Sequence, residues 1–239
     1  MGQHATGGAA GAVVALVVAV APAHRIGAGE TLWREVAGRP LIAWALAPLA
    51  NLAGLRACIV VVDDAATDRA QTLEWSPGRR VAVQPVAAGA NLASALRAGL
   101  PAALAAGEWV IALDAWAPLV SSASLRAGLL AAAQTGAAIA GEAVKETLKL
   151  VEGQRVAGTP PRASLRRLQP PVIARGDLWR GALADVAAPS PDDDLIALAL
   201  RFSVPLTVYA IDYPGARVAS EADLALVEAL LRERAPEAH

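Results

Sequence analysis

The residues best suited to bind phosphate follow an apolar run near the N-terminus. Residues 12–21 are almost entirely Ala and Val, and the short loop that follows carries His24, Arg25, Gly27 and Gly29. Glycines allow backbone N–H groups to approach phosphate oxygens, and arginine supplies positive charge. A strand, such a loop and then a helix are the local order of a nucleotide-binding α/β unit. The loop therefore predicts a phosphate contact.

Acidic side chains follow three further apolar runs. They are Asp63 with Asp64, Asp114 and Asp212. Open α/β sheets bind their ligands at the carboxyl ends of parallel strands, so a carboxylate at such an end is a candidate ligand contact. Asp114 fits a metal ligand because it ends a buried strand, and the competing interpretation is a turn or helix-capping aspartate.

Strands and helices are expected to alternate through most of the chain, with no internal repeat. Strands are expected at 12–21, 57–62, 80–86, 108–113, 137–144 and 205–211, and helices at 40–52, 67–75, 92–105, 122–135, 176–186, 192–202 and from the capping box at 220–223 onward. This alternation predicts an α/β fold, a three-layer αβα sandwich around a mostly parallel twisted sheet.

One segment, at about 145–171, departs from this alternation. Short strand-like stretches flank the turn Glu152-Gly-Gln, and pairs of prolines bracket a basic segment with Arg162, Arg166 and Arg167. This pattern is typical of a hairpin. We expect a β-arm inserted into one domain at 11–235, preceded by a disordered lead at 1–10.

Composition narrows the classes of function. The net charge of −1 and a pI near 6.3 do not favour nucleic acid as a partner. Cys58 is the one cysteine, which excludes a disulfide framework within the chain. The chain has only three histidines, so a histidine-based metal site or a Ser-His-Asp triad is disfavoured. The chain is expected in the cytoplasm.

The mean hydropathy is high, at +0.42, which raises the question of a membrane-spanning segment. The apolar run at 9–23 falls short of the roughly 18 to 20 residues that span a bilayer. No Lys or Arg precedes it, as would be expected of a signal peptide. The run is therefore interpreted as a buried parallel strand and not as a signal peptide or membrane anchor. A secreted or anchored interaction protein is accordingly disfavoured, and no membrane partner is expected.

Five short segments follow one another in an order typical of a known family. They are Gly38-Arg-Pro-Leu-Ile-Ala-Trp44, Leu113-Asp-Ala-Trp-Ala-Pro-Leu-Val120, Val144-Lys-Glu-Thr-Leu-Lys149, Arg162-Ala-Ser-Leu-Arg-Arg-Leu-Gln-Pro170 and Gly215-Ala-Arg-Val-Ala-Ser-Glu-Ala-Asp-Leu224. Together they resemble the 2-C-methyl-D-erythritol 4-phosphate cytidylyltransferases of isoprenoid synthesis, within the sugar-nucleotidyltransferase group. The resemblance covers about residues 12–232 and implies a nucleotide-diphospho-sugar transferase-like fold.

The resemblance implies attack of a sugar-phosphate oxygen on the α-phosphorus of CTP, with loss of pyrophosphate. It also implies Mg²⁺ and a homodimer in which the arm of one subunit reaches the acceptor site of its neighbour. The implied roles are Arg25 and Arg217 as catalytic cations, Asp114 as the metal ligand, and Ala23, Gly27, Gly89, Ser94, Lys149 and Arg162 as substrate-binding residues. Arg217 stands where the family has a lysine, so a planar guanidinium replaces a compact ammonium.

The chain also departs from the family pattern around the triphosphate. The glycine-rich loop is shortened to Pro22-Ala-His-Arg25, and Thr31 stands in place of the loop lysine, with Arg34 one helical turn later. The segment Ala88-Gly-Ala-Asn-Leu92 lacks the family's arginine, and Ala117 replaces another. Lost cations weaken transition-state binding, so two alternatives stay open. One is a catalytically inactive homologue that acts by binding, and the other is a nucleotidyltransferase with a different nucleotide or acceptor.

Overall fold

The computed structural model describes residues 11–20, 28–184 and 194–234. The predicted lead at 1–10 lies outside these residues. So do Ala23, Arg25 and Gly27 of the predicted phosphate loop. Both ends of that loop are described, since the chain is defined up to Val20 and again from Ala28.

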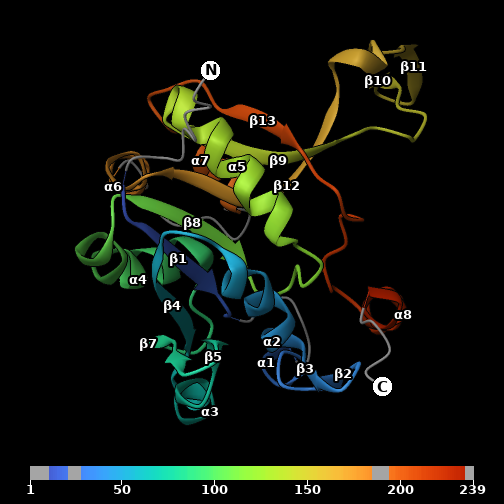
Figure 1. Cartoon of the computed structure of the whole chain (residues 1–239). Coiled ribbons are helices and arrows are strands. Elements are labelled where there is room, and N and C mark those ends of the chain that lie inside the picture. The colour runs from blue at the N-terminus through green and yellow to red at the C-terminus, as the bar shows by residue number, and fades with distance from the viewer. Residues whose placement is uncertain (1–10, 21–27, 185–193, 235–239) are drawn as a thin grey trace, which may run out of the picture.

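A seven-stranded sheet forms the centre of the described fold (Figure 1). In spatial order its strands are β13 (Thr207–Ala210), β9 (Ala137–Ala143), β12 (Arg166–Arg175), β8 (Trp109–Asp114), β1 (Val13–Val18), β4 (Leu55–Asp63) and β7 (Ala82–Val86). Only β12 runs antiparallel to its neighbours β8 and β9 among these strands. The predicted mostly parallel sheet is confirmed.

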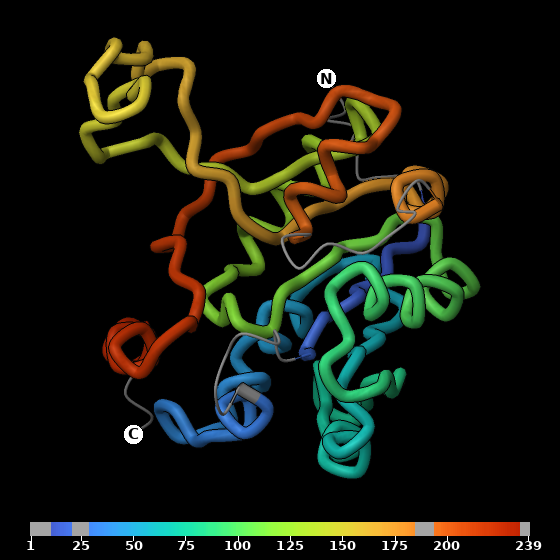
Figure 2. Tube along the Cα trace, turned by 180° about the vertical axis from the view of Figure 1, so that it is seen from behind, coloured from blue at the N-terminus to red at the C-terminus, as the bar shows by residue number. Residues whose placement is uncertain are grey.

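Helices cover both faces of this sheet (Figures 1 and 2). They are α1 (Ala28–Thr31), α2 (Leu41–Leu46), α3 (Thr67–Gln71), α4 (Leu92–Ala106), α5 (Ser122–Thr135), α6 (Gly176–Ala184), α7 (Leu195–Ala199) and α8 (Glu221–Arg234). One face packs against α2, α5 and α8, and the other against α4, α6 and α7. Since β1 has helices on both sides, all six of its residues are buried, as its continuous run of apolar side chains predicts.

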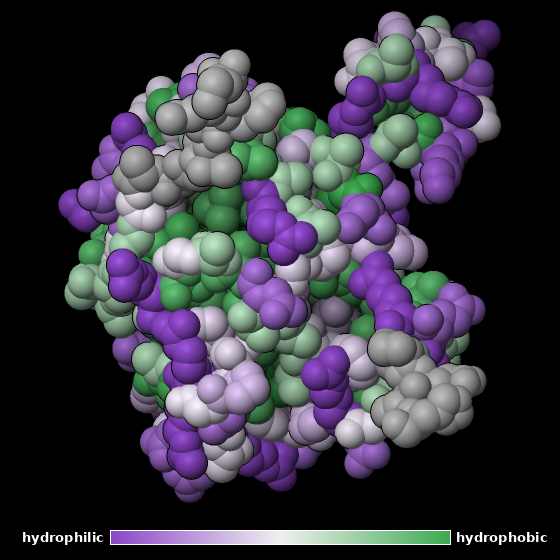
Figure 3. All heavy atoms as spheres, viewed as in Figure 1, coloured by the Kyte–Doolittle hydropathy of each residue, from purple (hydrophilic) through white to green (hydrophobic). Residues whose placement is uncertain are grey.

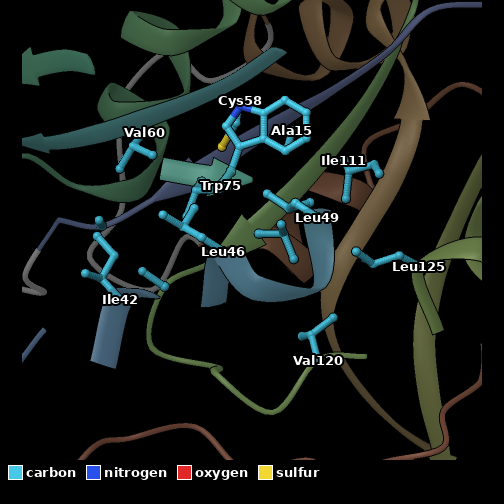
Figure 4. Packing of buried hydrophobic residues seen from close by; sticks show 14 of the residues in the cluster. Ala15, Ile42, Leu46, Leu49, Cys58, Val60, Trp75, Ile111, Val120 and Leu125 are labelled. Carbon is cyan, nitrogen blue, oxygen red and sulfur yellow. The ribbon is translucent and has the colours of Figure 1, made fainter. Parts of the chain in front are cut away.

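The core beneath α2 combines residues that are far apart in the sequence (Figure 4). Leu46 and Leu49 lie over the sheet beside Trp75, while Ile111 of β8 packs toward Leu125 of α5. Cys58 lies in the same cluster, and burial raises the pKa of its thiol. The cysteine is therefore part of the packing, as the sequence indicates.

Three predicted helices are shorter than expected. The helix predicted at 192–202 is α7, which follows the N-cap Asp194 and ends at Ala199. In the other two, different local structure replaces part of the predicted helix. The segment predicted as one helix at 40–52 is α2 followed by a 3₁₀ turn, η1 (Ala47–Asn51), which begins where Pro48 cannot continue the α-helical hydrogen bonding. The segment predicted at 67–75 follows the 3₁₀ turn η2 (Asp64–Ala66), stops at Gln71 and continues into a strand.

Within the described residues, three small hairpins lie outside the central sheet. They are β2 (Glu35–Val36) with β3 (Arg39–Pro40), β5 (Glu74–Ser76) with β6 (Arg79–Arg80), and β10 (Leu150–Glu152) with β11 (Arg155–Gly158). The third belongs to the predicted arm and projects from the body (Figure 1). A 3₁₀ turn, η3 (Arg162–Ser164), connects it to β12. Residues 166–169, expected in the arm, pair with β9 in the central sheet.

Close packing between the C-cap of α4 and the start of β1 gives a first testable prediction. A Cβ added at Gly107 would lie 2.5 Å from the Ala12 carbonyl oxygen and 2.8 Å from Val14 Cγ2. We expect Gly107→Ala to lower the free energy of unfolding by about 1–3 kcal/mol, since the backbone must shift. Urea denaturation followed by circular dichroism measures this change.

Gly181→Ala is the matched control, because nothing lies within 4 Å of an added Cβ in this exposed turn of α6. We expect it to leave stability unchanged or to raise it by about 0.5–1 kcal/mol through helix propensity. Equal destabilisation by the two variants would contradict the packing argument.

No helix in the described ranges is long and apolar enough to span a lipid bilayer.

Candidate functional site

The candidate site lies at the carboxyl edge of the sheet, where β1 and β8 end side by side. Val18 of β1 is the register partner of Asp114 at the end of β8, and the Ala115 N–H donates to the Val18 carbonyl at 3.0 Å. The chain leaves β1 for β4 on one side and later returns to β8 on the other. The site therefore sits where the strand order reverses, which is where open α/β sheets bind ligands.

Asp114 has a defined partner for each of its carboxylate oxygens. Oδ1 accepts a hydrogen bond from the Trp116 backbone N–H at 3.1 Å, and Oδ2 forms an ion pair with Nε of Arg217. The carboxylate side chain is 9% exposed and the Arg217 side chain is 46% exposed. The structure thus brings together two of the residues that the sequence singled out, although 103 positions separate them.

Trp116 connects this carboxylate to the end of β1. Its indole Nε1–H donates to the Val20 carbonyl at 3.1 Å, and its side chain is almost fully buried in the core. Its own carbonyl accepts from the Val218 N–H at 2.8 Å, directly after Arg217 in the chain. Trp116 therefore fixes the β1 exit and the Arg217 segment around Asp114. Sequence reasoning missed this role, and the large aromatic side chain two residues after the strand-end Asp114 was the available signal.

The predicted nucleotide-side residues lie at the start of α4. Gly89 adopts a left-handed φ of +78° in the turn between β7 and α4, a conformation that glycine tolerates best. Asn91 caps the helix by accepting from the Ser94 N–H at 2.9 Å. Because β7 belongs to the same parallel set as β1 and β4, this turn lies at the carboxyl edge of the sheet.

The two predicted arm residues form hydrogen bonds to other residues of the arm. Lys149 Nζ donates to Thr159 Oγ1 at 2.6 Å, and Arg162 reaches the Glu146 carbonyl at 3.5 Å. Their bonding therefore does not link them to Asp114 and Arg217 in the same chain. Arg34, the alternative to the loop lysine, pairs with Glu221 at the start of α8.

Asp114 could bind a magnesium ion if the phosphate oxygens of a bound substrate supplied further ligands. No group of three or more His, Cys, Asp or Glu side chains that could hold a metal occurs in the part of the chain described. Mg²⁺ commonly uses one or two carboxylates together with substrate phosphates, so Asp114 alone satisfies that pattern. In the described residues each oxygen of Asp114 accepts one hydrogen bond, and because a carboxylate oxygen has two lone pairs, each keeps a further lone pair that could approach an ion while Arg217 stays in place.

A wide groove lies next to this site. It has a volume of about 1290 Å³ and runs between the base of the arm and the segment 208–216. Its charged side chains include Lys145, Arg166 and Arg167, with Glu142 and Asp212 opposite in sign. Figure 3 shows the arm standing away from the body, with a hollow beneath it.

The chain is similar in sequence to one family of known proteins. The family model of 2-C-methyl-D-erythritol 4-phosphate cytidylyltransferase matches residues 13–233. A Dehalococcoides mccartyi protein of that name is 26% identical over 224 residues, covering 92% of this chain and 96% of its own. A bifunctional enzyme IspD/IspF from Dinoroseobacter shibae is 30% identical over 93% of this chain, which spans about half (54%) of that longer protein.

Solved structures agree in fold. The 4-diphosphocytidyl-2C-methyl-D-erythritol synthase from Anaerococcus prevotii superposes with a TM-score of 0.77 at 18% identity, covering 92% of this chain and 98% of its own. The 2-C-methyl-D-erythritol 4-phosphate cytidylyltransferase from Thermus thermophilus gives 0.68 at 24% identity, with 91% and 98% covered. The nearly complete coverage extends the agreement to the whole domain.

Proposed function

Because the chain belongs to the 2-C-methyl-D-erythritol 4-phosphate cytidylyltransferase family, we propose that it transfers CMP from CTP to 2-C-methyl-D-erythritol 4-phosphate and releases pyrophosphate. The observation that supports this most directly is the meeting of the β1 exit, Asp114 and Arg217 at one edge of the sheet. A carboxylate and a cation beside the end of β1 suit phosphoryl chemistry, which depends on positioning and charge stabilisation.

In this proposal the acceptor phosphate oxygen attacks the α-phosphorus of CTP, and the bond to the pyrophosphate leaving group breaks. Arg217 binds the acceptor phosphate, and Arg25 binds the triphosphate from the loop after β1. Gly89 and Ser94 contact the nucleotide, as do Ala23 and Gly27. Asp114 would hold Mg²⁺, which when bound supplies positive charge to the phosphate oxygens.

The test is a pyrophosphate-release assay with Mg²⁺, methylerythritol phosphate and each of CTP, UTP, ATP and GTP. We expect release that requires the acceptor and is fastest with CTP. Release with a different nucleotide would assign another nucleotidyltransferase activity to the same site. No release with any nucleotide, from protein that is folded by circular dichroism, would favour the inactive homologue. Since CTP and the acceptor are charged and do not cross membranes unaided, we place the reaction in the cytoplasm.

We further propose that the arm binds a second copy of the chain and carries Lys149 and Arg162 to the partner's acceptor site. The arm exposes four large apolar side chains, Leu148 (44%), Leu150 (57%), Val151 (58%) and Val156 (69%). A two-stranded hairpin is marginally stable on its own, so these side chains need a surface to pack against. A symmetric dimer supplies that surface without any other partner.

The double variant Val151→Glu/Val156→Glu tests this arrangement by sedimentation velocity. We expect the wild-type chain to sediment as a dimer and the variant as a monomer, because two buried carboxylates would have to lose their hydration. Leu200→Glu is the control, since Leu200 is 68% exposed but lies after α7, away from the arm. A wild-type monomer, or a variant that remains dimeric, would contradict the proposal.

A further inference from the structure

The loop that carries Arg217 is attached to β12, the strand that begins at the base of the arm. Nη2 of Arg167 donates to the Gly215 carbonyl at 2.9 Å, two residues before Arg217. Gly215 packs directly on Gln169, because an added Cβ would lie 2.1 Å from its Oε1. The Tyr213 hydroxyl reaches the Pro170 carbonyl at 3.4 Å. Three contacts from neighbouring residues of β12 therefore hold the loop before Arg217 against this strand.

The guanidinium of Arg167 is itself oriented by a cross-strand partner. Arg167 and Glu142 are register partners on β12 and β9, and Nε of Arg167 donates to Oε1 of Glu142 at 2.7 Å. The Nη2 group, which contacts the same carboxylate oxygen, also reaches Gly215. A planar guanidinium has several donors in fixed directions, so it can bond to the Glu142 carboxylate and the Gly215 carbonyl at the same time. A lysine ammonium is less suited to bridging these two acceptors.

The downstream side of Arg217 is fixed independently. Val218 donates to the Trp116 carbonyl at 2.8 Å, and Trp116 lies two residues after Asp114. Arg217 is therefore held between a contact from β12 on one side and a contact from the end of β8 on the other. Without the Arg167 hydrogen bond, the Gly215 carbonyl loses its donor two residues before Arg217, although Gln169 and Pro170 still contact the loop. The direction of the Arg217 guanidinium is then less restricted.

We propose that Arg167 is a positioning residue that sets the direction of Arg217 toward Asp114 and the acceptor phosphate. This inference rests on the proposed function. Its effect on folding is small, because the Arg167 side chain is 51% exposed and exposed ion pairs contribute little to stability. Its effect on catalysis is larger, because a displacement of a binding group by about 1 Å costs up to about 100-fold in rate.

Steady-state kinetics with Arg167→Met tests the positioning role. We expect the KM for methylerythritol phosphate to rise and kcat to fall, with kcat/KM lower by about 10- to 100-fold, while the KM for CTP changes less than about twofold. Arg167→Lys should recover part of the loss. Arg166→Met is the matched control, because Arg166 donates only to the Ala163 and Leu165 carbonyls of its own segment in the bonds described. We expect its kinetics to match the wild type.

A double-variant cycle separates action through Arg217 from a general structural role. In an Arg217→Ala background, Arg167→Met should cause no further loss, since the group that it positions is gone. An additive loss in the double variant, or an equal loss in Arg166→Met, would overturn the inference.

The Nε–H resonance of Arg217 in a nitrogen–proton correlation spectrum gives a readout that needs no turnover. We identify this signal by its absence in Arg217→Lys. We expect it to be protected from exchange in the wild type and in Arg166→Met, and to broaden in Arg167→Met. An unchanged signal in Arg167→Met would overturn the inference, even if the wild-type chain showed no pyrophosphate release. Absence of turnover with the expected spectra would instead count against the proposed function alone.

Discussion

Asp114→Asn is expected to reduce cytidylyl transfer by about 100- to 1000-fold, the range for losing one electrostatic contact to a transition state. The substitution preserves the shape of the side chain and its contact with the Trp116 N–H, but it removes the charge that Arg217 pairs with. It also removes the carboxylate at the end of β8 that could approach a magnesium ion carried by CTP. The measurement is kcat/KM for pyrophosphate release.

Asp212→Asn is the matched control for this variant. Asp212 also follows a strand of the central sheet, but its carboxylate is exposed and accepts from the Ser121 hydroxyl at 2.5 Å. We expect its rate to stay within about twofold of the wild type, since it makes no transition-state contact in the proposal. Equal effects of the two substitutions, or full activity of Asp114→Asn, would remove Asp114 from the reaction.

Trp116→Ala should give the largest loss of stability. The indole is 2% exposed and packs within the core cluster on the α2 and α5 face. Replacing a buried tryptophan with alanine costs about 3–5 kcal/mol of unfolding free energy, because it removes buried contacts and leaves a cavity. Urea denaturation followed by circular dichroism measures the change.

Trp116→Phe separates packing from hydrogen bonding. Phenylalanine fills most of the space but leaves the Val20 carbonyl without the indole donor, at a cost of about 1–3 kcal/mol. We also expect weaker CTP binding in both variants, because the β1 exit loses its connection to the end of β8. An alanine variant as stable as the wild type would show that Trp116 does not connect these strands.

The sequence predicted the layers of the fold because its signals there were local. Continuous apolar runs predicted β1, β4 and β8, and the polar residues after them predicted the ligand edge. No strand was predicted where β12 lies, and the reason is local as well. Pro170 and Pro171 indicated the end of the arm, yet the strand continues past them, with a register irregularity between Gln169 and Val172. Such a bulge accommodates residues that lack a backbone N–H.

The site was only partly predictable, because its contacts are long-range. The position of Asp114 at a strand end followed from the pattern of apolar residues. Its pairing with Arg217 did not, since no periodicity relates two residues 103 positions apart. The contact between Arg167 and Gly215 was missed for the same reason. The basic segment with Arg162, Arg166 and Arg167 was interpreted as part of the arm. One of its arginines, Arg167, contacts the loop that carries Arg217.

Calorimetric titration of CTP with Mg²⁺ into the wild-type chain and into Asp114→Asn tests the central claim, that the β1 exit and Asp114 together bind a metal-bound triphosphate. We expect one site in the wild type, a linked stabilisation of about 2.7 kcal/mol when CTP exceeds its dissociation constant 100-fold, and binding weakened at least about tenfold in Asp114→Asn. No binding by the folded wild-type chain at millimolar CTP, or equal affinity in the two proteins, would contradict the claim.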